Sequence, residues 1–295
     1  MKRMLFPILS FLFIAAPISG MAQNTEINTV PVADGIYMLT GRGGNIGLAV
    51  GEDGTFLIDD KYAPLTDAIM AAITEAGGDV PKFVVNTHAH GDHVGGNENF
   101  GKAGSVIVAH DNVRENLSAE HVSAFWGRTT PAAPKGALPV VTFNDEIRFH
   151  MNGEQVHVLH MARAHTDGDA VIIFENANVV HMGDIYFESG YPFIDTERGG
   201  NVNGVIAAAD AVLEFTDDDT RIMPGHGKIT GKKELKAYRD MLADIRDRVQ
   251  KLIDEGKTLD EIKAAGPSKK YDERWGQGFV NPDYIATFVY MSLTN

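Results

Sequence analysis

The chain has 295 residues, with 40 acidic and 26 basic side chains and no cysteine. The formal net charge of −14 argues against nucleic acid as a partner, because phosphate backbones are bound mainly through lysine and arginine, and no basic stripe with interleaved aromatic residues is present. The lack of cysteine excludes disulfides, thiolate catalysis and iron–sulfur clusters. Without a low-complexity linker, this length favours one large domain.

The N-terminus is typical of a secretory signal peptide. Lys2 and Arg3 precede an apolar stretch over residues 4–18, and small residues at Gly20 and Ala22 suit cleavage before Gln23. The stretch is shorter than the roughly 20 residues that span a bilayer. We therefore predict a signal at residues 1–22, a mature domain at 23–295, no stable membrane anchor and a periplasmic or secreted location. An uncleaved anchor is the alternative.

Cleavage also makes the mature chain more acidic. It removes two basic residues and no acidic one, so the formal charge changes from −14 to −16.

The first half of the mature chain reads as short strands alternating with helices. Apolar runs at residues 36–39, 46–50 and 56–58 are separated by glycine-rich turns and predict a strand meander, which is followed by a helix at about 64–76 and a buried strand at 83–85. Further strands are expected at residues 106–108, 140–143, 156–159, 171–174 and 179–180. This mixed order favours two packed sheets with helices outside.

The sequence THAHGDH at residues 87–93 directly follows the buried strand and predicts a metal site. In an extended segment, residues i and i+2 point to the same side, so His88 and His90 can bind one ion together. Asp92 and His93 lie one step beyond and can serve a second ion. A solvated, histidine-rich loop is the alternative, but neutral imidazole is a common zinc ligand.

Three later motifs add further candidate ligands. His165 begins HTDGD, Asp184 ends HMGD after a strand-like run, and His226 lies in PGHG. Each lies at a strand end or in a glycine-marked turn, where the backbone can bring side chains to a common rim.

The last third of the chain, from about residue 231, is predicted to be helical. Residues 235–253 carry apolar side chains at three- and four-residue spacing, and Gly256 offers a stop. Thr258 and Glu261 form a capping-box pattern, and a final helix begins near Pro282. We expect these helices to pack on an outer sheet face, with membrane or partner binding as the alternative.

These separated motifs, in this order, resemble the metallo-β-lactamase superfamily over nearly all of the mature chain. The resemblance implies an α/β fold, a four-layer αβ/βα sandwich of two mixed β-sheets with outer helices. It implies two Zn²⁺ ions per chain. The implied ligands are His88, His90 and His165 for the first zinc, Asp92, His93 and His226 for the second, and Asp184 as the bridge between them.

The resemblance also implies the chemistry. A hydroxide bridging the metals would attack the substrate, and Asp92 is the predicted catalytic residue that orients it and passes a proton to the leaving group. Asp184 stands where some β-lactamases use cysteine for the second zinc, which is more like hydroxyacylglutathione hydrolases and lactonases. Di-iron redox members usually carry glutamate in place of His90, so the sequence favours zinc.

We therefore predict an exported zinc hydrolase that opens an amide or ester bond of a small-molecule substrate. A β-lactam is the leading substrate, because antibiotics meet the cell in the periplasm. Alternatives are a lactonase, another esterase or a thioesterase, although lactonases place tyrosine where Phe187 stands. A non-catalytic periplasmic zinc-binding accessory protein is a different class, but structural zinc sites are normally closed by four protein ligands. The sequence leaves the oligomeric state open.

Several residues near these motifs are supporting candidates. Asp59, Asp60 and His160 are candidates to hydrogen-bond ligand imidazoles, with ordinary turn capping as the alternative for the two aspartates. Segments 121–134 and 186–193 contain aromatic residues that we expect to line the mouth of the site. The histidines expected not to bind metal are His110, His121, His150, His157, His160 and His181.

Overall fold

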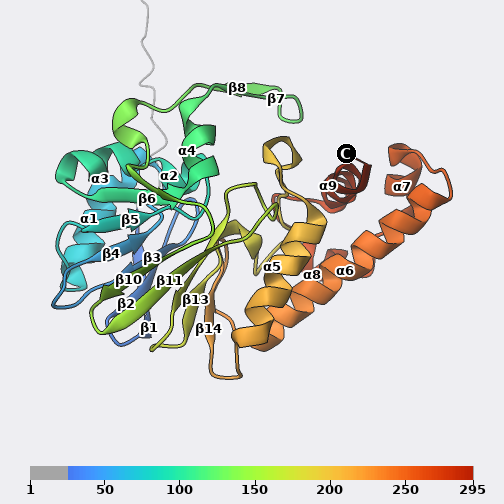
Figure 1. Ribbon diagram of the computed structural model, residues 1–295. Helices are drawn as coiled ribbons and strands as arrows, with labels where there is room; N and C mark the ends of the chain where they lie inside the picture. The colour runs from blue at the N-terminus through green and yellow to red at the C-terminus, as the bar shows by residue number, and fades with distance from the viewer. Residues whose placement is uncertain (1–25, 295) are drawn as a thin grey trace, which may run out of the picture.

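Two β-sheets pack face to face in the computed structural model, which describes residues 26–294 (Figure 1). The predicted signal at residues 1–22 lies outside the described residues. In the first sheet the strand order is β1 (Asn28–Ala33), β2 (Ile36–Thr40), β3 (Ile46–Ala49), β4 (Phe56–Ile58), β5 (Phe83–Val85), β6 (Val106–His110) and β9 (Val141–Phe143). In the second the order is β10 (Glu146–Met151), β11 (Glu154–His160), β12 (Ala170–Phe174), β13 (Val179–His181) and β14 (Arg221–Met223).

Both sheets are mixed. Strands β1 to β4 form an antiparallel meander, whereas β4, β5, β6 and β9 run parallel. In the second sheet β10 to β13 are antiparallel and β14 is parallel to β13. A separate hairpin of β7 (His121–Ser123) and β8 (Arg128–Thr130) stands away from both sheets, at the top of Figure 1.

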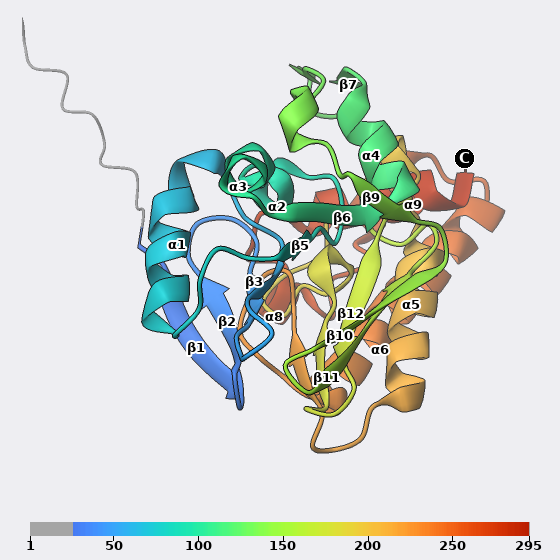
Figure 2. The ribbon, with the colours of Figure 1, turned by 60° about the vertical axis from the view of Figure 1, so that its left-hand side comes forward.

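Helices cover the outer faces of the two sheets and complete four layers (Figures 1 and 2). On the first sheet these are α1 (Thr66–Glu75), α2 (Gly91–Val94), α3 (Asn97–Ala103) and α4 (Asp111–Ser118). On the second they are α5 (Val202–Phe215) and α6 (Lys232–Asp254). Helix α9 (Pro282–Thr294) packs on both of these, α7 (Leu259–Ala265) packs on α6 and α9, and α8 (Asp272–Trp275) adds Trp275 to the same core. The predicted αβ/βα sandwich is confirmed.

Side-chain alternation along the strands creates these layers. In β4, Phe56 and Ile58 enter the core between the sheets, whereas Leu57 points to the outer face and packs with α1. Because both faces of this strand are covered, it reads as a continuous apolar run in the sequence. The ring of Phe56 lies 5.1 Å from that of Phe149 and 6.3 Å from that of Phe174, which joins the two sheets.

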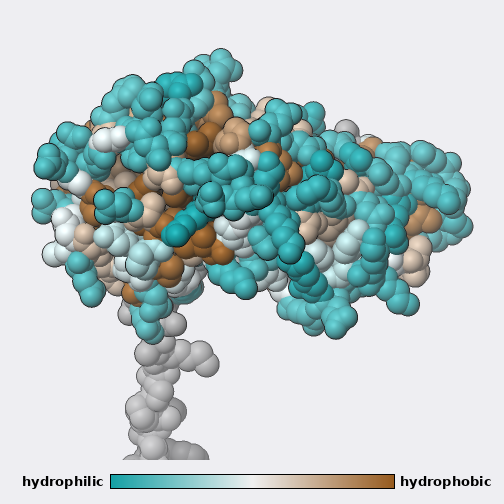
Figure 3. Space-filling model, turned by 90° about the horizontal axis from the view of Figure 1, so that it is seen from below, coloured by the Kyte–Doolittle hydropathy of each residue, from teal (hydrophilic) through white to brown (hydrophobic). Residues whose placement is uncertain are grey.

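The C-terminal helices pack as the three- and four-residue spacing predicts. Helix α6 buries Leu235, Tyr238, Met241, Leu242, Ile245 and Val249 in a core shared with α5 and α9. The other side of α6 faces solvent. The surface over the C-terminal helices, at the right of Figure 3, is mostly hydrophilic. Thr258 and Glu261 form the predicted capping box at the start of α7. Among residues 26–294, no helix combines the length and hydropathy needed to cross a membrane.

The structure contains strands that the apolar runs do not reveal. Strand β1 is an edge strand containing Pro31, a residue that sheets tolerate at edges because it lacks a backbone donor. Strand β10 mixes charged and apolar residues, and β14 is only three residues long. The β7–β8 hairpin has no extended apolar run.

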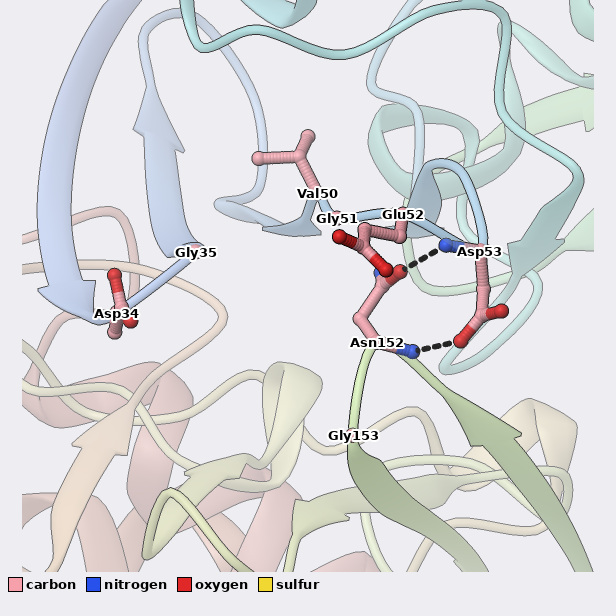
Figure 4. Close-up of a pocket in the computed structure, with 8 residues that line it drawn as sticks. All are labelled: Asp34, Gly35, Val50, Gly51, Glu52, Asp53, Asn152 and Gly153. Carbon is pink, nitrogen blue, oxygen red and sulfur yellow. Dashed lines mark hydrogen bonds between the residues drawn. The ribbon is translucent and has the colours of Figure 1, made fainter.

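One end of the two sheets carries an open pocket between turns, and the other end carries the predicted ligand motifs. The turns that precede β2, β4 and β11 lie at one end and enclose an open pocket of about 380 Å³ (Figure 4). There the backbone N–H of Asp53 donates to Asn152 Oδ1 (3.0 Å) and the N–H of Asn152 donates to Asp53 Oδ2 (2.7 Å), which ties the two sheets together. Strands β4, β5, β13 and β14 all end at the other edge, where the predicted ligand motifs begin.

We predict that Phe56→Ala lowers the free energy of unfolding by about 3–5 kcal/mol, because it removes a fully buried ring from the core between the sheets. Chemical denaturation monitored by circular dichroism would measure the change. Phe279→Ala is the matched control, since Phe279 is 70% exposed, and it should cost less than about 1 kcal/mol. Equal losses in the two variants would contradict this description of the core.

Candidate metal centre

The structure brings all seven predicted ligand residues together at one edge of the sandwich. They come from the loop after β5, helix α2, the loop after β11, the short turn after β13 and the loop after β14. Their ligand atoms form two groups, and within each group these atoms lie within 4.8 Å of one another. The first group is His88, His90, His165 and Asp184, and the second is Asp92, His93 and His226.

The carboxylate of Asp184 lies between the groups and turns one oxygen toward each. Its Oδ2 is 3.8 Å from His88 Nε2 and 3.7 Å from His165 Nε2. Its Oδ1 is 3.1 Å from His93 Nε2 and 3.4 Å from His226 Nε2. This is the arrangement that a carboxylate shared by two cations requires.

Three buried atoms at this point, His88 Nε2, His93 Nε2 and Asp184 Oδ1, have no hydrogen bond of good geometry, although the last two lie 3.1 Å apart. An unsatisfied buried polar atom costs about 1–3 kcal/mol, so three of them at one place call for a common partner. Imidazole nitrogens together with carboxylate oxygens are a donor set that suits zinc. The residues present therefore fit two divalent cations.

Burial keeps the imidazoles of His88 and His165, in the first group, neutral. It lowers the pKa of His88 well below its usual value, and the neighbouring imidazoles of His93 and His165 lower it further. Burial, together with the nearby His90, lowers the pKa of His165 to about 4. At neutral pH both side chains therefore offer a lone pair, as a metal ligand must.

In the second group the neighbouring carboxylates raise the pKa values of the imidazoles. Burial alone would lower the pKa of His226, but Asp184 and Asp92 raise it to about 9. Asp184, Asp59 and Asp92 likewise raise the pKa of His93 against the effect of burial. Without a cation these imidazoles hold protons beside the carboxylates, and a cation in this group would have to displace them.

Hydrogen bonds from outside the two groups orient the imidazoles. Asp59 Oδ2 accepts from His93 Nδ1 at 2.7 Å, which confirms the prediction for Asp59. Asp195 Oδ2 accepts from His90 Nε2 at 2.8 Å and leaves Nδ1 facing His165 Nε2. The backbone carbonyl of Phe193 accepts from His165 Nδ1 at 2.7 Å. Such partners fix the tautomer and the ring orientation of metal-binding histidines.

Two of the predicted supporting roles are wrong. Asp60 accepts from the backbone N–H of Gly96 at 2.8 Å and contacts no ligand imidazole, because the chain turns sharply at Asp59, where φ is 63°. His160 bonds the backbone carbonyl of Asp169, and its ring stacks on His110 at 3.7 Å. The six histidines outside the motifs all lie outside both ligand groups.

A glycine-rich loop before β3 supports the second group, and the motifs gave no sign of this role. The side chain of Asn45 donates to the backbone carbonyls of Pro224 (3.0 Å) and Gly227 (2.9 Å), on either side of His226. The residue before His226 is glycine because its backbone passes very close to the Asp184 carboxylate. A Cβ at Gly225 would lie 2.1 Å from Asp184 Oδ1.

Aromatic side chains surround the mouth, partly as predicted. Phe187 stacks on His226 with ring centroids 5.0 Å apart, and Phe193 stacks on His90 at 5.6 Å. Trp126, from the β7–β8 hairpin, lines a small cavity together with His90 and Phe193. Tyr186 and Tyr191, by contrast, are buried away from the mouth, where their hydroxyls bond Thr230 and Asp272.

Solved structures share the fold at low sequence identity. An inverting sec-alkylsulfatase, Pisa1 from Pseudomonas sp., aligns with a TM-score of 0.70 and 19% identity over 91% of this chain and 50% of its own. A metallo-β-lactamase from Pontibacter korlensis aligns at 0.60 and 16% identity, over 74% of this chain and 100% of its own. The DIM-1 metallo-β-lactamase aligns at 0.60 and 18% identity, over 75% and 98%.

A curated relative and a family model match the sequence itself. The hydroxyacylglutathione hydrolase of Nitrosococcus oceani is 25% identical over 144 residues, which cover 48% of this chain and 47% of that protein. The match therefore spans about half of the relative's length. The model of the metallo-beta-lactamase superfamily matches residues 39–227, a span that contains all seven candidate ligands. Because this match covers well over half of the chain, the protein belongs to the metallo-β-lactamase superfamily.

Proposed function

We propose that this protein, a metal-dependent hydrolase by its family, is an exported dinuclear zinc enzyme that opens an ester or amide bond in a small molecule. The observation that carries the proposal is the position of Asp184, whose two oxygens face two separate groups of ligand atoms. The export part rests on the signal-like residues 1–22. The proposed location is therefore the periplasm or the medium.

Two bound zinc ions, held by the two ligand groups, would supply Lewis acidity and lower the pKa of bound water toward neutrality. Asp92 is the residue we assign to proton transfer. Burial would raise its pKa, but His93 and His226 hold that pKa far below its usual value, so the carboxylate is ionised at neutral pH. Its side chain is 21% exposed, so a substrate can reach it, and the ionised carboxylate is the group to which we assign proton transfer between the nucleophile and the leaving atom.

β-Lactams are the first substrate class to test, because two β-lactamases share the fold over nearly their whole length. Esters, lactones and thioesters are the second class, supported by the similarity to a hydroxyacylglutathione hydrolase and by aspartate at position 184. A non-catalytic zinc-binding role is disfavoured because Asp92 and His226 are 21% and 32% exposed, which leaves the second group open to ligands.

The proposal is tested by a hydrolysis panel on the purified protein comprising residues 23–295. β-Lactams, acyl-homoserine lactones, thioesters, aryl esters and sulfate esters would be compared with and without zinc. We expect at least one substrate of the panel to be hydrolysed at its carbon–oxygen, carbon–sulfur or carbon–nitrogen bond. A chelator should abolish this activity and added zinc should restore it. A fully zinc-loaded protein that is inert to the whole panel would contradict the enzymatic proposal.

We predict that the protein binds two zinc ions per chain and that Asp184→Ala weakens both, because each group loses a carboxylate oxygen. Elemental analysis after dialysis and competition with a chromogenic chelator would measure content and affinity. Asp247→Ala, at a 67% exposed position on α6, is the control and should keep both ions. Full zinc content and unchanged affinity in Asp184→Ala would disprove the shared ligand.

We predict that the two zinc affinities depend differently on pH. The second group must release a proton from His226, whose pKa is about 9 in the metal-free protein, so its affinity should rise about tenfold per pH unit per proton displaced between pH 6.5 and 8.5. The first group contains neutral His88 and His165 and should change much less. Chelator-competition titrations at several pH values would test this, and parallel pH profiles would count against it.

We predict that Asp92→Asn lowers kcat by about 10²–10⁴-fold, the usual effect of losing a general acid or base, while the first zinc stays bound. The amide keeps a ligand oxygen but cannot hold the proton. Steady-state kinetics and zinc analysis on the same preparation would separate the two effects. Turnover at the wild-type rate with both metals present would mean that Asp92 serves only as a ligand.

A further inference from the structure

We propose that Lys61 is a positioning residue for the second ligand group, that of Asp92, His93 and His226. Its buried ammonium group holds the glycine-rich loop at residues 41–45 against this group and so keeps the ligands at the spacing that one cation requires. The inference rests on the proposed dinuclear site and deepens it, because it makes the second ion, but not the first, depend on a side chain that binds no metal.

Lys61 lies in a strained turn that directly follows β4. Asp59 and Lys61 have φ values of 63° and 56°, a left-handed conformation that is unfavourable for residues other than glycine and is concentrated at functional sites. The turn is tied to α2, which carries two of the three ligands. The backbone N–H of Asp60 donates to the carbonyl of His93 at 2.9 Å, and the N–H of Gly95 donates to the carbonyl of Lys61 at 2.7 Å. These bonds hold the Lys61 backbone in a fixed position relative to α2.

The ammonium group of Lys61 is buried and donates to the backbone. The residue has no solvent exposure, and its Nζ donates to the carbonyl of Gly44. Within residues 26–294, no carboxylate oxygen lies within 4.0 Å of this nitrogen. Burial lowers the pKa of Lys61 to about 8, against the opposing effect of Asp92 and Asp59, so the group is charged at neutral pH. A buried charge is costly unless nearby groups compensate for it, so the hydrogen bond to Gly44 is a strong, charge-assisted contact.

The loop that Lys61 holds lies against the ligands of α2. The backbone N–H of Gly44 donates to the carbonyl of Asp92 at 3.3 Å. A Cβ at Gly44 would lie 2.1 Å from Cε1 of His93, so the loop backbone contacts that imidazole directly. A shift of Gly44 would therefore be transmitted to both ligands.

The same loop is bonded to the turn that carries the third ligand. The backbone N–H of Asn45 donates to the carbonyl of Gly225 at 2.7 Å, and the Asn45 side chain donates to the carbonyls on either side of His226. The loop therefore joins α2 to the His226 turn and fixes the separation between ligands that lie more than 130 residues apart in the sequence.

A second buried basic side chain holds the next carbonyl of the loop. His181 is fully buried, and its Nδ1 accepts from the backbone N–H of Gly183 at 3.2 Å. Its Nε2 is therefore the nitrogen that donates, to the carbonyl of Asn45 at 3.3 Å. Lys61 and His181 thus fix two consecutive carbonyls of the loop.

The first ligand group is oriented by other parts of the chain. Asp195 accepts from His90, and the carbonyl of Phe193 accepts from His165, and neither partner belongs to the loop. Loss of the Lys61 hydrogen bond should therefore weaken the second ion selectively. Electrostatic repulsion alone predicts the opposite sign, because removing a positive charge beside the second group would strengthen cation binding. The direction of the change separates anchoring from repulsion.

The test is a chelator-competition titration of zinc binding to Lys61→Met, whose new side chain has a similar length but neither charge nor donor. We expect the Kd of the second ion to rise at least tenfold and that of the first to change less than threefold. Lys61→Gln keeps a donor and should lose less affinity. His226→Ala identifies the binding step that belongs to the second group. Phe56→Ala controls for lower stability and Lys236→Met, at a 61% exposed site on α6, for a lost positive charge, and both should bind zinc as the wild type does.

Cobalt supplies a second readout, which depends on neither affinity nor turnover. The visible absorption spectrum of bound Co²⁺ reports the geometry of its ligands. In Lys61→Met the bands of the first ion should match those of the wild type, whereas the bands of the second ion should change. Phe56→Ala should reproduce both wild-type spectra, because lower stability alone alters neither set of ligands.

If Lys61→Met does not fold, Lys61→Gln and Asn45→Ala decide, the latter because it removes the side-chain contacts of the same loop to the His226 turn. Both should weaken the second ion selectively. Unchanged affinities, equal weakening of both ions or a tighter second ion would overturn the role of Lys61, while a wild type that binds two ions would leave the dinuclear site intact. A wild type that binds only one ion would overturn the dinuclear proposal and this inference together.

Discussion

A single buried carboxylate is the constraint around which the metal centre is arranged. Burial would raise the pKa of Asp184, but the imidazoles of His226 and His93 hold it well below its usual range, so the group stays ionised at 5% exposure. It can face both ligand groups only because strands of both sheets end at the same edge. The core between the sheets, anchored by rings such as Phe56, thereby fixes the distance between ligands that are far apart in the sequence.

The positions of the ligands were largely predictable, because local spacing and strand ends decide them. His88 and His90 lie in one group, as i and i+2 residues of an extended segment should, and Asp92 and His93 fall in the other. Their supporting partners were not predictable. Asp195 meets His90 across 105 residues and Asn45 meets the His226 turn across about 180, and no local pattern encodes such contacts. Asp59 and Asp60 look alike in sequence, yet the positive φ at Asp59 sends only one of them to an imidazole.

The same distinction applies to the fold. Strands buried on both faces, such as β4 and β5, appear as apolar runs and were predicted, whereas the edge strand β1 and the mixed strand β10 lack that signal. The β7–β8 hairpin depends on Glu197 and on aromatic packing with Phe193, so its place over the cavity follows from tertiary contacts alone. Sequence therefore indicates the metal ligands more directly than it indicates the loops around them, which are positioned by tertiary contacts.

The central claim is that Asp184 holds two metal ions at one shared site. Zinc K-edge X-ray absorption spectroscopy on the zinc-loaded protein tests it most directly, because the extended fine structure reports both the ligand atoms and any neighbouring metal. We predict a shell of nitrogen and oxygen ligands at about 2.0–2.2 Å and a zinc–zinc distance of about 3.5–4 Å. A spectrum from fully loaded protein that lacks any metal–metal contribution would contradict the account.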